Sequence, residues 1–284
     1  MERIFIKSIK IIGSLLILFY LGVCIWFYYN QGSFIFMNPV KLPNNLKYDF
    51  QGNFEEINFD VEDSIKINSL LFKSEIQPSK GVILTLKGAG GNISNQNEVA
   101  KIYNDEGFDF YVMDYRGYGK SQGCYNNDLQ MYKDGQAAYD ILLERGYKED
   151  EIIIIGVSLG SGVASYLAAN NSPSQLILIS PYKSMKDLAK NLTLPKLKYL
   201  RYLPTDLLLR YNLDNAEHIK KVKAPVTIFH GTADRLIYYG SSLKLKDCFK
   251  PADTLITIKD GIHRGFGGRP DVLEGIREII NGQK

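Results

Sequence analysis

A serine flanked by two glycines marks the segment of this chain that could carry nucleophilic chemistry. Residues 156–160 read GVSLG, directly after the β-rich run 152–155 and before a run that is compatible with a helix. In a nucleophile elbow the serine occupies a strained turn from strand to helix, and the glycines are needed because side chains there would strike the neighbouring strand and helix. The pentapeptide alone would also fit an ordinary tight turn, but its context predicts that Ser158 is a nucleophile.

A serine hydroxyl becomes a good nucleophile when a base, commonly a histidine held by a carboxylate, removes its proton. The chain has three histidines. His218 stands among charged residues on a stretch that we expect to be a solvated helix. His230 ends a buried strand, where we expect it to support the turn. His263 lies in a glycine-rich loop just beyond a strand, so elimination selects His263 as the general base.

The carboxylate is expected on another loop after a strand, between the serine and the histidine along the chain. Asp234, in the sequence HGTAD at 230–234, satisfies both conditions. Other aspartates are weaker candidates because they fall in an irregular insertion or flank a surface helix; they are Asp206, Asp214, Asp247 and Asp253. The predicted catalytic set is therefore Ser158, Asp234 and His263.

Alternating strands and helices must hold these residues at one edge of a sheet. Two runs that alternate apolar and polar residues, 55–62 and 65–72, predict a half-buried hairpin. Almost wholly apolar runs predict parallel strands that are covered on both faces, at 82–86, 108–113, 152–156, 176–179, 226–229 and 255–258. Helical stretches lie between them, at 95–106, 129–145, 161–170, 241–248 and 271–281. The pattern predicts one doubly wound α/β domain with a mostly parallel sheet.

One stretch, 181–222, breaks this alternation. It exceeds an ordinary connection and therefore predicts a small helical cap. Its section 182–210 has seven basic residues and two acidic ones. It also holds leucines that suit an apolar underside, namely Leu192, Leu194, Leu197, Leu200, Leu203, Leu207, Leu208 and Leu209.

Composition sets limits on function. Of the 284 residues, 45% are hydrophobic and 23% are charged, with a net charge of +3 and three cysteines, which is typical of neither a disordered nor a disulfide-stapled protein. This small net charge offers no argument for a nucleic-acid partner. Because cysteines and histidines do not cluster with metal-ligand spacing, we expect no metal or other cofactor. We also expect no disulfide between Cys124 and Cys248.

The first thirty residues predict a membrane anchor. From Ile11 to Tyr29 no side chain is charged at neutral pH, and nineteen residues span roughly 28 Å as a helix. A cleaved signal peptide is the rival, but the apolar run is long and ends in the aromatic belt 26–29. Three basic residues precede the run and the next follows at Lys41, so we expect the N-terminus in the cytoplasm and the bulk of the chain, 31–284, on the other side.

Five motifs give the chain a specific resemblance. They are KGAGGN at 87–92, DYRGYGKS at 114–121, the serine segment, SPY at 180–182 and HGTAD at 230–234. With them the chain resembles membrane-anchored serine hydrolases of the α/β-hydrolase superfamily, in the branch of serine aminopeptidase-like proteins and monoglyceride lipases, over roughly residues 53–282. The resemblance implies triad roles for the three predicted residues and an oxyanion hole made by the backbone N–H groups of Ala89 and Leu159.

Two further residues in these motifs are Lys87 and Arg116. Relatives usually carry histidine where this chain has Lys87. We expect lysine to be tolerated because the oxyanion donors are main-chain groups; the rival explanation is that the loop has changed and activity is lost. Arg116 is expected to be structural and to tie down the loop after its strand.

Ser-His-Asp chemistry transfers an acyl group to water, and esters, thioesters and amides share that route. The apolar and basic cap suggests an amphiphilic or lipid-like acyl ester taken near the bilayer, although an ordinary solvated cap would suit a soluble substrate equally well. A serine aminopeptidase or amidase remains an alternative, and so does a non-catalytic membrane-anchored scaffold. The partners expected are therefore a small-molecule or lipid-like acyl substrate and the membrane.

Overall fold

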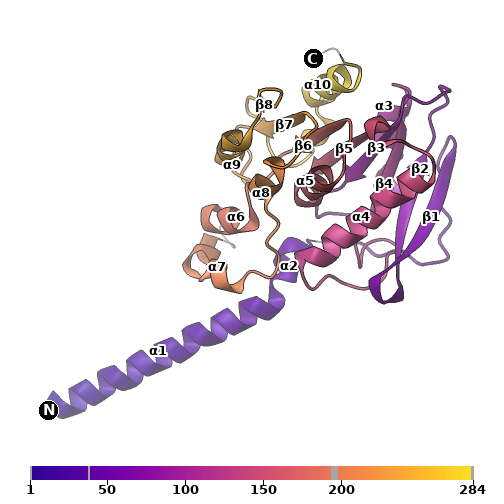
Figure 1. The fold of residues 1–284 in the computed structure, drawn as a ribbon. Helices are drawn as coiled ribbons and strands as arrows, with labels where there is room; N and C mark the ends of the chain where they lie inside the picture. Colours follow the sequence, from indigo (N-terminus) through magenta and orange to yellow (C-terminus); the bar gives the residue numbers. More distant parts are fainter. Residues whose placement is uncertain (1, 38, 193–197, 283–284) are drawn as a thin grey trace.

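A computed structural model of the chain describes residues 2–37, 39–192 and 198–282. Eight strands form one sheet in the order β1-β2-β4-β3-β5-β6-β7-β8 (Figure 1). Their bounds are β1 Phe54–Val61, β2 Ile65–Phe72, β3 Val82–Leu86, β4 Asp109–Met113, β5 Ile152–Val157, β6 Gln175–Ile179, β7 Val226–Gly231 and β8 Thr254–Ile258. Strands β3 to β8 are parallel, whereas β2 is antiparallel to both β1 and β4. The predicted fold class is confirmed, and each predicted strand lies within two residues of an observed one.

Helices cover both faces of the sheet. The α-helices are α1 Glu2–Asn30, α2 Gly32–Ile35, α3 Asn97–Asn104, α4 Asp128–Glu144, α5 Gly160–Asn170, α6 Met185–Asn191, α7 Thr205–Leu208, α8 Asn215–Ile219, α9 Gly240–Leu245 and α10 Pro270–Ile280. Short 3₁₀ helices are η1 Glu62–Ser64, η2 Ile93–Asn95, η3 Glu149–Glu151, η4 Lys198–Tyr202, η5 Lys246–Cys248 and η6 Phe266–Gly268. One apolar core lies under α4, α5 and α8, and a second lies under α3 and α10 on the opposite face.

Two expectations about burial were wrong at the sheet edges. The later part of β2 is buried on both faces because Ile67 and Leu71 join one apolar core while Leu70 and Phe72 join the other, so the hairpin is half-buried only along β1. Strand β8 is the last strand of the sheet, and its side chains are exposed or only half-buried. The short apolar run 255–258 therefore did not distinguish an edge strand from a central one.

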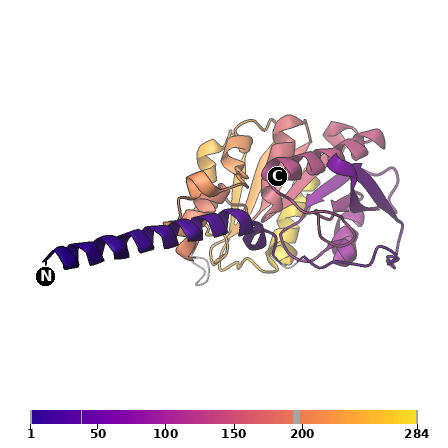
Figure 2. The same cartoon turned by 90° about the horizontal axis from the view of Figure 1, so that it is seen from below.

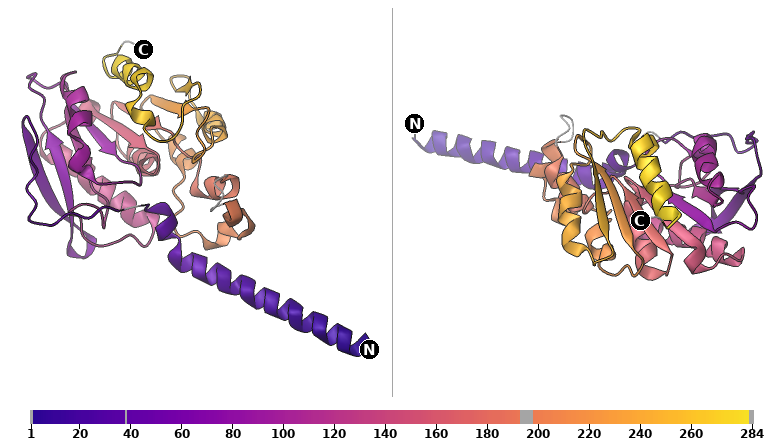
Figure 3. Two further views of the ribbon diagram at one scale, coloured as in Figure 1. Left: turned by 180° about the vertical axis from the view of Figure 1, so that it is seen from behind. Right: turned by 90° about the horizontal axis from the view of Figure 1, so that it is seen from above.

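Helix α1 projects from the folded body and reaches it only at its C-terminal end, beside α2 and α7 (Figures 1 and 2). Its free N-terminal end lies far from the body in both views of Figure 3. The helix is long and apolar enough to cross a membrane, properties that a signal sequence near the N-terminus shares.

The described residues of 181–222 form short helices between β6 and β7, and the last of these helices packs against α5. Helices α6, η4, α7 and α8 belong to this segment. Of its residues singled out from the sequence, Leu194, Lys196 and Leu197 lie outside the described residues. Hereafter we call 181–222 the cap.

Candidate active site

The structure brings the three predicted side chains together. His263 Nδ1 lies 2.7 Å from Asp234 Oδ2, and His263 Nε2 lies 3.1 Å from Ser158 Oγ. With Nδ1 donating to the carboxylate, Nε2 can accept the proton of the serine hydroxyl. The contacts join residues that are 105 and 29 positions apart in the chain.

Ser158 sits on a strained turn between β5 and α5. Its φ of 50° lies in the left-handed region, which is unfavourable for a residue with a Cβ atom. A Cβ at Gly160 would lie 2.0 Å from the Leu86 carbonyl oxygen of β3, and a Cβ at Gly156 would lie 2.5 Å from Ala164 Cβ of α5. The two glycines therefore let strand and helix approach closely enough to hold the serine in this turn, as the sequence predicted.

The loops that carry Asp234 and His263 are held against each other by a second pair of glycines. Gly231 ends β7 and Gly261 follows β8, and a Cβ at Gly231 would lie 2.2 Å from the Gly261 carbonyl oxygen. The Ala233 N–H donates to that same oxygen at 3.0 Å. This close approach keeps the carboxylate beside the imidazole, and sequence reasoning did not find it because it joins two loops whose adjacency only the fold defines.

Asp234 accepts hydrogen bonds on both of its carboxylate oxygens. Oδ1 accepts from the N–H groups of Leu236 and Ile237, each at 2.9 Å, while Oδ2 accepts from His263. Burial alone would raise the pKa of Asp234, but hydrogen bonds from His230, His263 and the Ile237 N–H outweigh it and hold the pKa well below its usual range. The carboxylate thus stays ionised and fixed in orientation.

His230 supports the Asp234 turn, as expected, and does not reach the serine. Its ring is fully buried, with Nε2 2.9 Å from the Ile237 carbonyl oxygen and 3.5 Å from Asp234 Oδ2. Its Nδ1 lies 2.6 Å from Ser242 Oγ at the start of α9. The imidazole therefore links the Asp234 turn to the start of α9.

The expectation for His218 was wrong. Its ring does not stand in solvent but packs edge-on against Tyr132 and Tyr166, with centroids 5.5 and 5.4 Å away. Burial lowers the pKa of His218, despite the neighbouring Glu217. The charged neighbours in the sequence concealed this contact; Glu217 and Lys221 are exposed and form an ion pair with each other.

The loop 87–91 passes directly over Ser158 and is held by tyrosine hydroxyls. Tyr115 donates to the Lys87 carbonyl and Tyr118 donates to the Ala89 carbonyl, each at 2.7 Å. Ala89 and Leu159 line the same pocket as Ser158. Leu159 is also the N-cap residue directly before α5, where helix geometry leaves N–H groups without intrahelical acceptors.

Lys87 is the first residue of this loop, and its side chain is buried and paired with Asp114. Its Nζ lies 3.6 Å from Asp114 Oδ1, donates to the Gly91 carbonyl at 3.2 Å and lies 4.2 Å from the ring centroid of Tyr118. Burial raises the pKa of Asp114 to about 6 against the opposing effect of Lys87, and burial lowers the pKa of Lys87. The lysine side chain therefore holds the far end of the loop at Gly91.

We expect Lys87→His to change kcat/KM for a short ester by less than about tenfold, because the loop keeps both tyrosine hydrogen bonds and its main-chain donors. Hydrolysis of p-nitrophenyl acetate measures the effect. Tyr118→Phe is the comparison variant, since it removes the bond to the Ala89 carbonyl and is expected to lower kcat. A loss of more than 100-fold in Lys87→His alone would show that the lysine side chain itself is needed.

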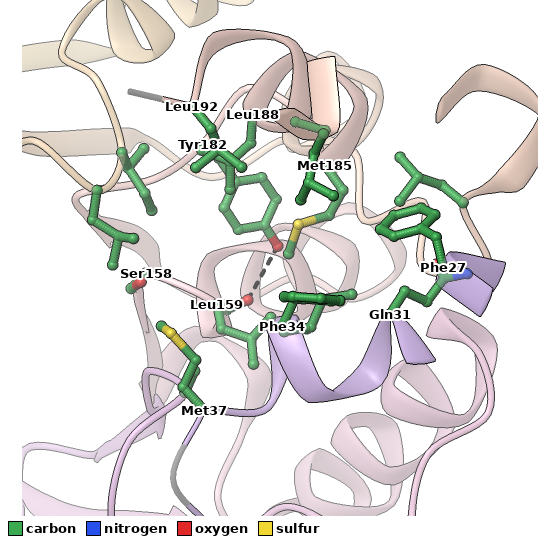
Figure 4. A pocket seen from close by; sticks show the side chains of 17 residues that line it. Phe27, Gln31, Phe34, Met37, Ser158, Leu159, Tyr182, Met185, Leu188 and Leu192 are labelled. Atoms are coloured by element: carbon green, nitrogen blue, oxygen red, sulfur yellow. Dashed lines mark hydrogen bonds between the residues drawn. The ribbon is translucent and has the colours of Figure 1, made fainter. Parts of the chain in front are cut away.

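A largely apolar pocket begins at Ser158 and continues under the cap (Figure 4). Among the described residues that line it, Gln31, Ser158 and Tyr182 carry polar atoms and none carries a charge. The expected cap leucines contribute through Leu192, Leu200 and Leu209, whereas Leu207 points to solvent. The remaining walls come from the elbow, the loops after β3 and β7, the start of the cap and, at the side away from Ser158, Phe27, Phe34 and Met37.

Sequence reasoning missed the contribution of residues 27–37 to this pocket. A signal for it was present, because the run Phe34-Ile35-Phe36-Met37 continues the apolar character beyond the expected membrane span. A linker exposed to water would be expected to be polar at this point.

Arg116 is structural, as expected. Its guanidinium makes two hydrogen bonds of 2.7 Å to Asp134 on α4, and both side chains are buried. All three cysteines lie within the described part of the chain, and each carries a free thiol.

Comparisons with known proteins agree with this architecture. Residues 77–215 match the family model described as serine aminopeptidase, S33. The chain is 30% identical to the bem46 protein of Schizosaccharomyces pombe over 145 residues, which cover 49% of this chain and 48% of that protein. It is also 30% identical to the lysophosphatidylserine lipase ABHD12 of Danio rerio over 194 residues, which cover 62% of this chain and 49% of that protein. The chain thus spans about half the length of these two relatives.

A solved structure shares the fold. The Pyrococcus furiosus esterase Pf2001 superposes with a TM-score of 0.68 and 18% sequence identity, over 86% of this chain and 97% of the esterase. Together with the sheet order and the strand-to-helix turn at Ser158, this likeness shows that the chain has the α/β-hydrolase fold, and residues 77–215 are similar to the serine aminopeptidase S33 family.

Proposed function

We propose that the chain is a serine hydrolase that cleaves a long-chain acyl ester of an amphiphile at a membrane. Ser158 is the nucleophile, His263 the general base and Asp234 the carboxylate that orients the imidazole. The backbone N–H groups of Ala89 and Leu159 stabilise the oxyanion.

The reaction proceeds through an acyl-serine intermediate. His263 Nε2 takes the hydroxyl proton while Ser158 Oγ attacks the ester carbonyl carbon, and the developing oxyanion accepts hydrogen bonds from the two N–H groups. His263 then returns the proton to the leaving alcohol oxygen as the ester C–O bond breaks. Water then gives a proton to the same nitrogen and attacks the acyl carbonyl carbon. His263 passes that proton to Ser158 Oγ as the acyl–Oγ bond breaks, which releases the carboxylic acid and restores the serine.

The observation that carries the proposal is the uncharged, apolar pocket that begins at the serine hydroxyl. Burying an acyl chain there removes it from water, which favours binding by about 0.8 kcal/mol of free energy for each CH₂ group. An aminopeptidase substrate has a free ammonium group, which needs a carboxylate or several acceptors when buried. No carboxylate is present among the described lining residues, which favours an ester over a peptide substrate. The similarity to a lysophosphatidylserine lipase supports the same class of substrate.

Helix α1 is proposed to anchor the enzyme in the bilayer, with its N-terminus in the cytoplasm and the folded domain on the other side. The cap has exposed basic side chains at Lys190, Lys198 and Arg201. Each can contribute about 1 kcal/mol of binding free energy when it lies near anionic head groups. Tyr199 and Tyr202 beside them are exposed and of the amphipathic type that is enriched at membrane interfaces.

A fluorophosphonate probe tests the proposed nucleophile. We expect the wild-type chain to be labelled and Ser158→Ala to remain unlabelled, because the probe reacts with an activated serine. Ser172→Ala is the matched control, since Ser172 is an exposed serine outside the pocket. Failure of the wild-type chain to react would favour the non-catalytic scaffold. A panel of p-nitrophenyl esters, lysolipids and aminoacyl amides then separates an esterase from an aminopeptidase.

A further inference from the structure

The C-terminal part of α1 has one buried face although most of the helix is exposed. Cys24 and Phe27 are buried, with Phe27 only 2% exposed, while the neighbouring Ile25 is 61% exposed. Gln31, one turn further on, is also buried. These positions are three or four residues apart and therefore lie on one face of the helix. That face packs against the cap.

Polar contacts fix the position of this face. The Gln31 side chain donates to the Leu208 carbonyl at 3.0 Å and accepts from the Arg210 N–H at 2.8 Å, so it bonds the cap main chain on both sides of Leu209. Closer to the N-terminus, the Tyr20 hydroxyl donates to the Tyr202 carbonyl at 3.0 Å. Because the partners are backbone groups of the cap, these hydrogen bonds fix the position of the end of α1 relative to the cap.

The same part of the chain lines the pocket of Ser158. Phe27 of α1, Gln31 between α1 and α2, Phe34 of α2 and Met37 after it are all lining residues. In Figure 4, Met37 lies near Ser158 and Phe27 lies at the opposite side of the pocket, with Phe34 between them. The segment from the end of α1 to Met37 therefore reaches from the far end of the pocket to the reacting hydroxyl.

We propose that the end of α1 and helix α2 form one wall of the acyl-binding site, so that Phe27 and Phe34 determine which acyl lengths the enzyme accepts. The inference rests on the proposed ester hydrolysis. Its ligand is a single long acyl chain of a membrane amphiphile. The chain lies along the anchor helix with its ester at Ser158.

The position of α1 also gives the acyl chain a route from the bilayer. Tyr20 to Tyr29 belong both to the apolar span expected in the membrane and to the segment that meets the cap. The edge of the cap at η4, where Tyr202 is 70% exposed, therefore contacts α1 within this segment. A chain that leaves the bilayer beside α1 reaches Phe27 first and needs no passage through water.

The linker after α2 extends the wall to the loop over the serine. Pro39 pairs with Gly91 and Lys41 pairs with Gly119 in short β-bridges, and the Asn92 side chain donates to the Val40 carbonyl at 3.0 Å. The wall is thus continuous in the chain from the anchor to the proposed oxyanion loop. This continuity ties the position of α1 to the geometry of the site.

The ratio of long-chain to short-chain ester hydrolysis tests the inference in the full chain, reconstituted in detergent micelles. We expect Phe27→Ala and Phe34→Ala each to lower kcat/KM for p-nitrophenyl palmitate relative to p-nitrophenyl acetate by about tenfold or more, because each removes an aromatic ring from the contact with the chain. Ile25→Ala is the matched control on the exposed face of α1 and should leave the ratio unchanged. An unchanged ratio in both phenylalanine variants would overturn the inference.

A binding measurement separates this inference from the proposed function. A fluorescent sixteen-carbon fatty acid is titrated into Ser158→Ala, with and without Phe27→Ala. We expect weaker binding when Phe27 is replaced, even if the wild-type chain proves to hydrolyse no ester. Equal binding with and without Phe27 contradicts the acyl wall, whereas lack of esterase activity with Phe27-dependent binding contradicts only the proposed catalysis.

Discussion

Replacing Asp234 with asparagine is expected to lower kcat for ester hydrolysis by about 10³- to 10⁴-fold while the protein still folds. Oδ2 of Asp234 accepts the Nδ1–H of His263 at 2.7 Å. With Oδ1 kept as the acceptor for the Leu236 and Ile237 N–H groups, the amide nitrogen of asparagine would face the imidazole and donate to Nδ1. The proton would then sit on Nε2, which could no longer accept the proton of Ser158.

The measurement is steady-state hydrolysis of p-nitrophenyl acetate together with a thermal unfolding curve for each variant. Asp206→Asn is the matched control, because Asp206 forms an exposed ion pair with Lys190 on the cap surface. A loss of activity below tenfold in Asp234→Asn, with normal unfolding, would mean that another group orients the imidazole. Because the pKa of Asp234 is held below its usual range, the wild-type carboxylate stays ionised at neutral and mildly acidic pH, so the comparison is valid there.

The sequence sufficed for the parts of this site that depend on local patterns. Ser158 follows a β-rich run and precedes a helical one, so the elbow could be placed before any fold was known. Asp234 and His263 each follow an apolar run, and parallel strands bring their carboxyl ends to one edge of a sheet. The geometry at that edge agrees with the predicted grouping.

Contacts between distant segments could not be predicted in this way. The approach of Gly231 to Gly261, and the pairing of Lys87 with Asp114, join loops whose distance depends on strand order. No periodicity within one segment reports strand order. His218 illustrates the same limit, because its tyrosine partners come from α4 and α5.

In the N-terminal helix, apolar residues of the same type have different surroundings, because Phe27 is buried while Ile25 is 61% exposed. Its composition predicted only contact with lipid. A residue that faces lipid and a residue that faces an acyl pocket have the same apolar character, so Phe27 could not be told from Ile25 by type. The polar Gln31, placed one turn after Phe27 in an apolar region, is the residue whose type was informative, since a buried amide requires partners.

The second large effect is expected at the buried pair of Arg116 and Asp134. Replacing only Arg116 with methionine should lower the free energy of unfolding by about 3–5 kcal/mol, because it leaves the Asp134 carboxylate buried without its counter-charge. Burial already raises the pKa of Asp134 above its usual value even with Arg116 present. Without the guanidinium, the native state favours the protonated carboxyl more strongly than the unfolded chain does. The loss of stability should therefore shrink as the pH falls, since protonation removes the uncompensated charge.

The double variant Arg116→Met/Asp134→Leu distinguishes loss of a charge partner from loss of packing. Two apolar side chains of similar size leave no buried charge, so the double variant should recover most of the stability that Arg116→Met loses. Unfolding by urea in detergent micelles at pH 8 and pH 5 measures all four members of the cycle. If the two single effects simply add, and neither changes between the two pH values, then the pair acts only by filling space. The loop after β4 would in that case be held by packing against Tyr125, whose ring centroid lies 5.4 Å from the Arg116 guanidinium carbon.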